Sequence, residues 1–225
     1  MEAKKNITND IVTDYINGFY EPLTDDLAEL REKSEEEHVP IILKETESFL
    51  KTFLGITAPK RILEIGCAVG YSAMFFAELA GAEVFTVEKD HEIFLTAKKN
   101  IEKYGYSKLV TVLEGDGQEA AEVLHKQGVQ SFDFVFIDAA KSHYKRFLEG
   151  CLPLCTKDTV ILSDNVLFQA RVADDRYDPS GKYKTNIKRM REFLDFIHQD
   201  PRFDSSVIAV GDGLALTRLT KMEKD

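Results

Sequence analysis

The chain has 225 residues and carries 39 acidic against 29 basic side chains, which gives a net charge of -10. Its hydrophobic content of 44% and charged content of 30% are typical of a globular protein and exclude a disordered or collagen-like chain. The apolar runs are shorter than the roughly 18 residues that suggest a membrane span, and we expect no secretory signal. The acidic balance argues against a nucleic-acid partner, because such proteins usually carry net positive charge.

The three cysteines are Cys67, Cys151 and Cys155. They form no CxxC pair, and no cluster of cysteine and histidine has the spacing of zinc ligands. This cysteine usage predicts a reducing, cytoplasmic location and no thiolate metal site.

Residues 1–59 are acidic and are expected to be helical. Apolar residues recur at helical spacing from residue 7 to residue 16, and again after Pro40, a residue that suits the first turn of a helix. We expect these helices to form an N-terminal cap packed on a Rossmann-like core of residues 60–225. The whole chain, 1–225, is then a single domain.

From residue 60 on, short apolar runs alternate with amphipathic segments. The predicted strands span residues 61–66, 83–88, 110–115, 132–138, 159–164, 205–210 and 214–219. The predicted helices of this part span residues 72–80, 91–104, 118–127, 143–152 and 186–199. Apolar strands alternating with helices indicate a parallel sheet covered on both faces, and a GDG connection between the last two strands indicates a hairpin. The sequence thus predicts an α/β, doubly wound sheet of seven mostly parallel strands with an antiparallel C-terminal hairpin strand.

A glycine-rich turn follows the first predicted strand, in the segment ILEIGCAVGYS at residues 62–72. It lacks the GxGxxG pattern of dinucleotide sites, since its glycines, Gly66 and Gly70, are four residues apart. Both glycines let the backbone approach a small ligand, and Ser72 can form a hydrogen bond at the start of the helix. Glu64 adds a carboxylate, which suits a cationic ligand better than a pyrophosphate.

Two further polar positions follow the next strands. Glu88 comes 22 residues after Gly66, where an acidic residue accepts hydrogen bonds from a ribose diol. Asp116 and Gly117 follow the third strand and are placed to meet the edge of an adenine ring. A nucleoside with a cationic tail describes S-adenosylmethionine better than NAD. The alternative is that the glycines only turn the chain and that Glu88 is solvated.

The fourth and fifth predicted strands also end in polar side chains. Asp138 closes FVFIDAAK, and Asp164 and Asn165 close VILSDN. Their oxygen atoms form a ligand set suited to Mg²⁺ or another divalent cation. Lys141 comes three residues after Asp138 and can act as a general base or stabilise charge at the same oxygen. The alternative is a helix near Lys141 capped by Asp138, with Asn165 as a turn residue.

The motifs EIGCAVGYS, FIDAAK and SDNVLF resemble the class I, metal-dependent O-methyltransferases of the catechol and caffeoyl-CoA type. The resemblance covers essentially the whole chain. It implies Asp138 and Lys141 as catalytic residues, and it implies Asp138, Asp164 and Asn165 as Mg²⁺ ligands. It also implies a set of residues around S-adenosylmethionine: Ile42, Glu64, Gly66, Ser72, Glu88, Asp116, Gly117 and Asp138. It favours a homodimer, and His38 receives no catalytic role.

The resemblance leaves two acceptors open. EEEHVPII, DNVLFQARVA and VGDGLALT look closest to a bacterial branch of the family that methylates 5-hydroxyuridine at the tRNA wobble position. Residues 171–191 hold seven basic and three acidic side chains, with Tyr177 and Tyr183 among them, and suit an anticodon loop. They can equally be a solvated helix face.

The metal site alone does not separate these acceptors, because a catechol and a 5-hydroxyuracil both offer two adjacent oxygens. The resemblance to the bacterial branch favours tRNA as the acceptor, hence a role in tRNA processing, with a small catechol or caffeoyl-CoA type molecule as the alternative. A non-catalytic nucleotide-binding module or an NAD-dependent dehydrogenase is a distant alternative.

Overall fold

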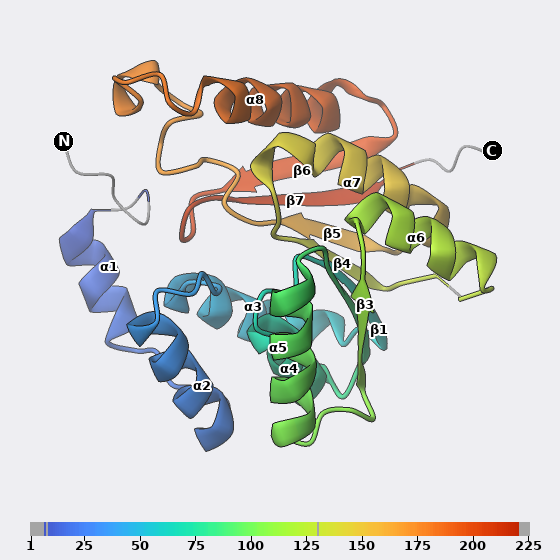
Figure 1. Cartoon of the computed structure of the whole chain (residues 1–225). Helices are drawn as coiled ribbons and strands as arrows, with labels where there is room; N and C mark the ends of the chain where they lie inside the picture. The colour runs from blue at the N-terminus through green and yellow to red at the C-terminus, as the bar shows by residue number, and fades with distance from the viewer. Residues whose placement is uncertain (1–6, 8, 130, 221–225) are drawn as a thin grey trace.

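The computed structural model describes residues 7, 9–129 and 131–220 and contains one seven-stranded sheet with helices on both faces (Figure 1). The strands are β1(Arg61–Ile65), β2(Glu83–Glu88), β3(Val110–Glu114), β4(Phe134–Ile137), β5(Val160–Ser163), β6(Phe203–Ile208) and β7(Leu214–Leu219). The helices are α1(Asp10–Asn17), α2(Asp25–Glu36), α3(Lys44–Thr57), α4(Tyr71–Ala80), α5(His91–Lys103), α6(Gly117–Lys126), α7(Tyr144–Cys151) and α8(Lys184–Gln199). Short 3-10 turns are η1(Lys141–His143), η2(Leu152–Leu154) and η3(Asp175–Tyr177).

The strand order is β3-β2-β1-β4-β5-β7-β6. The first five strands are parallel to one another, and β7 runs antiparallel to both β5 and β6. The fold is therefore the predicted α/β, Rossmann-like sheet with an antiparallel C-terminal hairpin strand, and this prediction is confirmed.

Side chains on successive strand positions alternate between two hydrophobic clusters, as the two-residue period of a strand requires. In β4, Val135 and Ile137 pack with α6, α7 and α8, whereas Phe134 and Phe136 pack on the opposite face with α3 and α4. Figure 1 shows the same division, with α6, α7 and α8 on one side of the sheet and α1–α5 on the other. Burial on both faces explains why the central strands are almost entirely apolar.

The helices of the predicted cap pack on the α4 side of the sheet. Leu27 and Leu30 of α2 and Leu50 and Leu54 of α3 are buried in the same cluster as Phe76 of α4. Because one apolar cluster joins these helices to the strands, we propose that cap and sheet form a single domain.

The structure corrects two details of this cap. In α1 the apolar residues face away from the protein, since Ile11 and Tyr15 are 79% and 72% exposed and Thr13 is the buried residue. The apolar spacing predicted the helix correctly but its buried face wrongly. Pro40 does not lie in a first helical turn, because α3 begins at Lys44 after an extended segment.

No helix among the described residues is long and apolar enough to cross a membrane. Cys67, Cys151 and Cys155 are all buried free thiols.

Candidate active site

The predicted site residues lie at one edge of the sheet, where the parallel strands β1, β2, β4 and β5 end. Glu64 is the last but one residue of β1, Glu88 ends β2, and Asp138 follows β4. Asp164 and Asn165 follow β5. Ligands of open α/β sheets bind in the crevice beyond these strand ends, so the topology brings together residues that are up to 101 positions apart.

The glycine-rich turn between β1 and α4 is pressed against the end of β4. Gly66 has a φ angle of 104°, and a Cβ atom at this position would come 1.9 Å from the carbonyl oxygen of Asp138. Only glycine allows this approach. The amides of Gly66 and Cys67 each donate to the carbonyl oxygen of Val87 at 3.0 Å, so the turn is held against the end of β2 as well.

The turn forms one wall of a cavity of about 290 Å³. The cavity is lined by Pro40, Ile41, Ile42, Gly66, Cys67, Ala68, Tyr71, Ser72, Asp138, Ala139, Lys141 and Asn165. Four of the residues predicted to surround S-adenosylmethionine are among them: Ile42, Gly66, Ser72 and Asp138. The structure therefore brings these four together from the cap, the glycine-rich turn and the end of β4.

Glu88 and Asp116 do not line this cavity, and both make local contacts. The Glu88 carboxylate accepts hydrogen bonds from the amides of Ala68, Lys89 and Asp90 at 3.1, 2.8 and 2.9 Å, so it is not simply solvated. Asp116 caps α6 through the amide of Gln118 and forms an ion pair with Arg146 at 2.6 Å.

Gly117 begins α6 and faces β1. A Cβ atom there would meet the Ile65 side chain at 2.4 Å. The position therefore requires glycine for packing, whatever ligand lies nearby.

Glu64 is fully buried beside the cavity. One of its carboxylate oxygens accepts from the Thr86 hydroxyl, while Oε1 has no hydrogen-bond partner among the described residues. Burial raises the pKa of Glu64 to about 8, although the nearby hydroxyls of Ser72 and Thr86 lower it. A buried carboxyl with an unpaired oxygen is the kind of group that a cationic or hydrogen-bond-donating ligand satisfies.

The end of β5 forms the second half of the site. Asp164 is fully buried, and its Oδ1 accepts from the backbone amide and the side-chain amide of Asn165 at 2.6 and 3.1 Å. Its Oδ2 has no hydrogen-bond partner among the described residues. Lys141 Nζ donates to Asn165 Oδ1 at 3.1 Å, so the three side chains form one chain of contacts.

The alternative explanation of these residues is partly correct. Asn165 has a φ angle of 55° and is indeed a turn residue in the left-handed region. Asp138 is not a helix cap, because the turn η1 begins after Ala140 and receives no side-chain cap.

Two carboxylates at this edge resist ionisation. Burial raises the pKa of Asp138, which Lys141 offsets in part, and burial together with Asp138 raises the pKa of Asp164 well above its usual value. Two such carboxylates and an amide oxygen fit a hard divalent cation, whose charge would stabilise their ionised forms. The described residues hold no group of three or more His, Cys, Asp or Glu side chains placed to hold a metal ion, so any such site depends on Asn165 as its third ligand.

A second, more open cavity of about 700 Å³ adjoins the first. The two share Pro40, Ile41, Ile42, Lys141 and Asn165 as lining residues. The larger cavity is also lined by Thr13, Asn17, Arg31, Glu35, His38, Val39, Leu43, Lys44, Glu45, Phe168, Gln169 and Asp212. We call the smaller one the cofactor cavity and the larger one the acceptor cavity, after the roles that we propose for them.

Asp212 is a buried residue of the acceptor cavity that the sequence analysis missed. Its carboxylate accepts from the backbone amide of Gln169, and its carbonyl oxygen accepts from the amide of Leu167 at 3.1 Å. Burial raises the pKa of Asp212 to about 7, although Lys141 and Arg171 lower it. The GDG motif predicted only a turn, and nothing in its spacing indicated that the turn reaches the loop after β5.

Tyr144 is a second residue that the sequence did not single out. It is fully buried, and its hydroxyl donates to the carbonyl oxygen of Asp164 at 2.8 Å. Its ring packs edge-on against Phe193 of α8. The backbone that presents Asp164 is thereby fixed from the α7 side.

The basic segment 171–191 is less free than its composition suggests. Arg171 is 6% exposed and stacks on the rings of Phe168 and Tyr183. Arg191 donates to the carbonyl oxygen of Val172 and to Asp175. Further ion pairs join Arg176 to Asp174 and join both Lys188 and Arg189 to Glu192. Much of the positive charge is therefore used within the protein.

A family model described as O-methyltransferase matches residues 20–220. The probable caffeoyl-CoA O-methyltransferase 2 of Dictyostelium discoideum is 28% identical, and the alignment covers 96% of this chain and 94% of that protein.

Solved structures are also similar, among them the following two. One is a putative caffeoyl-CoA O-methyltransferase from Staphylococcus aureus, with a TM-score of 0.86 and 29% identity, covering 93% of this chain and 100% of that one. The other is a methyltransferase from Podospora anserina with S-adenosylhomocysteine (SAH) bound, with a TM-score of 0.83 and 26% identity, covering 94% and 95%. The chain thus belongs to the O-methyltransferase family and is an S-adenosylmethionine-dependent O-methyltransferase of the caffeoyl-CoA and catechol type.

Proposed function

We propose that the enzyme methylates one of two adjacent oxygens on a small, catechol-like acceptor, with a divalent cation at the end of β5. The observation that supports this most directly is that Lys141 and Asn165 line both cavities. An acceptor that occupies the larger cavity could therefore place its reacting oxygen beside these two residues, next to a methyl donor in the smaller cavity. The caffeoyl group, named in two of the similar proteins, carries two neighbouring hydroxyls.

The cation would be held by Asp138, Asp164 and Asn165, of which Asp164 offers an unpaired Oδ2. Bound there, Mg²⁺ would supply Lewis-acid stabilisation of an acceptor oxygen, and S-adenosylmethionine in the cofactor cavity would supply the methyl group. Of the predicted contacts, Ile42, Gly66, Ser72 and Asp138 line the cofactor cavity and would contact the cofactor there. Contacts from Glu64, Glu88, Asp116 and Gly117, which do not line this cavity, stay predictions of the sequence.

Lys141 acts on the acceptor hydroxyl in this proposal. Its Nζ lies 3.1 Å from Asn165 Oδ1, which directs the ammonium group to the same place as the acceptor oxygen. There the neutral amine would accept the hydroxyl proton, or the ammonium form would balance the negative charge that develops on the oxygen. Holding both reactants side by side accounts for much of the expected rate.

The 5-hydroxyuridine of tRNA is the second candidate acceptor. The exposed side chains of Lys182, Lys184, Lys188 and Arg189 favour it, since phosphates bind to such groups. The internal ion pairs of residues 171–191 and the names of the similar proteins favour the small acceptor instead.

A direct assay separates the two acceptors. The enzyme with S-adenosylmethionine and Mg²⁺ is given either a caffeoyl ester or tRNA that contains 5-hydroxyuridine, and products are identified by mass spectrometry. We expect turnover of the small acceptor. Methylation of tRNA alone would replace the first proposal by the second.

The cation is tested by Asp164→Ala. We expect this variant to lose methyl transfer and to retain SAH binding in calorimetry, because Asp164 is not among the residues that line the cofactor cavity. Asp158→Ala, an exposed change just before the opposite end of β5, is the matched control and keeps activity. Full activity of Asp164→Ala in the presence of a chelator would refute the metal site.

A homodimer stays a prediction. The exposed apolar side chains of α1, such as Ile11 and Tyr15, offer a surface for a second copy of the chain. Sedimentation equilibrium of the wild type and of Ile11→Ser tests it, and a wild-type monomer would refute it.

A further inference from the structure

Arg31 of α2 lies in the wall between the two cavities. It is 5% exposed and lines the acceptor cavity. Its Nε donates to the hydroxyl of Tyr71 at 3.1 Å, and Tyr71, the first residue of α4, lines the cofactor cavity. A single hydrogen bond thus connects a residue of one cavity with a residue of the other.

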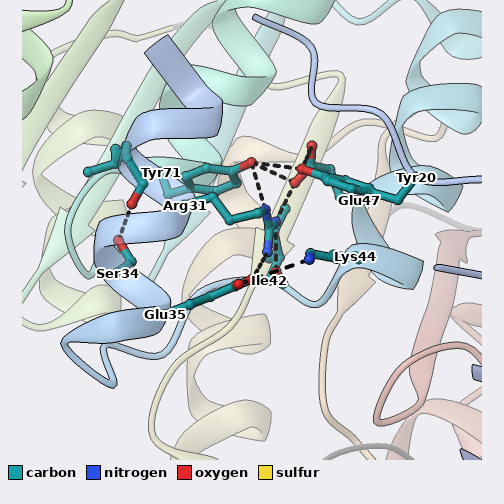
Figure 2. A network of polar contacts seen from close by, with 9 residues as sticks. Tyr20, Arg31, Ser34, Glu35, Ile42, Lys44, Glu47 and Tyr71 are labelled. Atoms are coloured by element: carbon teal, nitrogen blue, oxygen red, sulfur yellow. Dashed lines mark hydrogen bonds and ion pairs between the residues drawn. The ribbon is translucent and has the colours of Figure 1, made fainter. Parts of the chain in front are cut away.

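Glu47 of α3 completes a buried network around this bond (Figure 2). Its Oε2 forms an ion pair with Arg31 Nη2 and accepts from the Tyr71 hydroxyl at 2.7 Å, while Oε1 accepts from the Tyr20 hydroxyl at 3.0 Å. The guanidinium also stacks on both tyrosine rings, at 5.3 Å from Tyr20 and 4.7 Å from Tyr71. The planar group of arginine can make these contacts together, whereas the single ammonium of lysine cannot.

The network also holds the segment that the two cavities share. Arg31 Nη2 donates to the carbonyl oxygen of Ile42 at 3.0 Å. Residues 40–42 line both cavities and belong to no helix or strand, so no ladder of backbone hydrogen bonds fixes their position. Arg31 therefore connects α2 to this segment and to the start of α4 at the same time.

Stability alone is a weak explanation for such a cluster. A buried ion pair often contributes no more than a well-packed apolar pair of the same size, because both charges must leave water. Its hydrogen bonds, however, define the directions of the groups that they join, which apolar packing does less strictly.

We propose that Arg31 is a positioning residue that holds the shared wall, so that the affinities for S-adenosylmethionine and for the acceptor both depend on the Arg31–Glu47–Tyr71 network. The acceptor part of this inference rests on the proposed function. The cofactor part rests only on the membership of the O-methyltransferase family and on the geometry of the cavity.

The first test removes one hydroxyl. Tyr71→Phe keeps the ring and loses the bonds to Arg31 and Glu47. We expect the dissociation constant of SAH, measured by calorimetry, to rise about tenfold, the effect of one or two lost hydrogen bonds. The matched control is Tyr106→Phe, because Tyr106 is also buried and donates to a carboxylate, Glu78, at 2.9 Å, but lines neither cavity.

The second test uses Arg31→Lys, which keeps the charge but not the forked geometry. We expect the KM values for S-adenosylmethionine and for the acceptor to rise together by about tenfold, with kcat within about twofold of wild type, because Lys141 and Asp164 are untouched. Arg61→Lys is the control, since Arg61 pairs with Glu83 on β2 away from both cavities.

The outcomes are distinct. If Tyr71→Phe and Arg31→Lys bind SAH within twofold of wild type, the positioning role is wrong, whatever happens to the unfolding temperature. If Arg31→Lys does not fold, Tyr71→Phe decides the question alone. If no tested acceptor is turned over by the wild type, the acceptor assignment has failed, and SAH binding still tests the role of Arg31.

Discussion

The cofactor cavity and the acceptor cavity adjoin, but they are built differently. The cofactor cavity is formed chiefly by the turn after β1 and by the end of β4, and backbone hydrogen bonds hold that turn to the end of β2. The acceptor cavity is formed by four parts of the chain that are distant in the sequence, at residues 13–45, 141, 165–169 and 212. Side-chain bonds help to hold these segments in place: Arg31 donates to the carbonyl oxygen of Ile42 within the first segment, and Asp212 accepts from the amide of Gln169 across two others.

The shape of the cofactor cavity is thus determined mainly by backbone geometry, whereas the shape of the acceptor cavity depends more on individual side chains. Backbone contacts tolerate most changes of side chain, except where a glycine is needed. Side-chain contacts change with single substitutions. Apart from the wall that Arg31 and Tyr71 share, we therefore expect variants of the cofactor side to act through glycine and burial, and variants of the acceptor side to act through polar partners.

The largest effect is expected for Gly66→Ala. The added methyl group would lie 1.9 Å from the Asp138 carbonyl oxygen, so the backbone of the turn must move. We expect loss of detectable SAH binding in calorimetry and a decrease of about 3 kcal/mol or more in the free energy of unfolding. Gly55→Ala in α3, where nothing lies within 4 Å, is the control and is expected to stabilise the protein slightly. Normal SAH affinity of Gly66→Ala would contradict the backbone account.

A smaller effect is expected from Glu64→Gln on the pH dependence of stability. The pKa of Glu64 is raised from the usual 4.5 to about 8, so between these pH values the folded protein holds a proton that the unfolded chain has lost. The free energy of unfolding therefore falls as the pH rises through this range, by up to about 1.4 kcal/mol per pH unit. Urea unfolding between pH 5 and pH 8 in the absence of ligand should show a shallower slope for Glu64→Gln. Equal slopes would contradict a protonated Glu64.

On the acceptor side, Asp212→Ala removes the partner of the Gln169 amide. Phe168, Gln169 and Ala170 all have φ angles between 47° and 64°, a strained conformation that this bond supports. We expect the KM of the acceptor to rise about tenfold, with SAH affinity unchanged. Asp212→Asn keeps an oxygen that can accept this hydrogen bond, so its KM for the acceptor should lie between those of the wild type and of Asp212→Ala. A parallel loss of SAH binding would show that Asp212 supports the cofactor cavity as well and would contradict this prediction.

The smallest effect is expected when Lys184, Lys188 and Arg189 are changed to Gln. These side chains are exposed on α8, and two of them already pair with Glu192. Turnover of a small acceptor should stay within about twofold of wild type, since exposed ion pairs contribute little. Weaker and less salt-sensitive binding of tRNA by this variant would instead support the tRNA acceptor.

The sequence predicted much of the fold because periodicity is a local property. The predicted ranges of strands such as β2 and β7 agree with the observed bounds, and the GDG turn predicted the antiparallel hairpin correctly. The prediction from the sequence was wrong for the buried face of α1, because apolar residues at helical spacing do not show whether the rest of the protein covers them.

The candidate site likewise contains residues that the sequence could identify and residues that it could not. Glycine-rich turns and acidic residues at strand ends are short patterns with a steric or electrostatic reason, so Gly66, Asp138, Asp164 and Asn165 could be singled out before their neighbours were known. The basic composition of residues 171–191 overstates the positive charge available to a partner, because Arg171 and Arg191 bind groups within the protein.

Only the tertiary structure brought Arg31 to Tyr71, 40 positions away, and Asp212 to Gln169, 43 positions away. These contacts depend on how the cap, the loop after β5 and the final hairpin meet beyond the sheet edge. No local period encodes that meeting, since it is decided by the packing of distant segments on a common core.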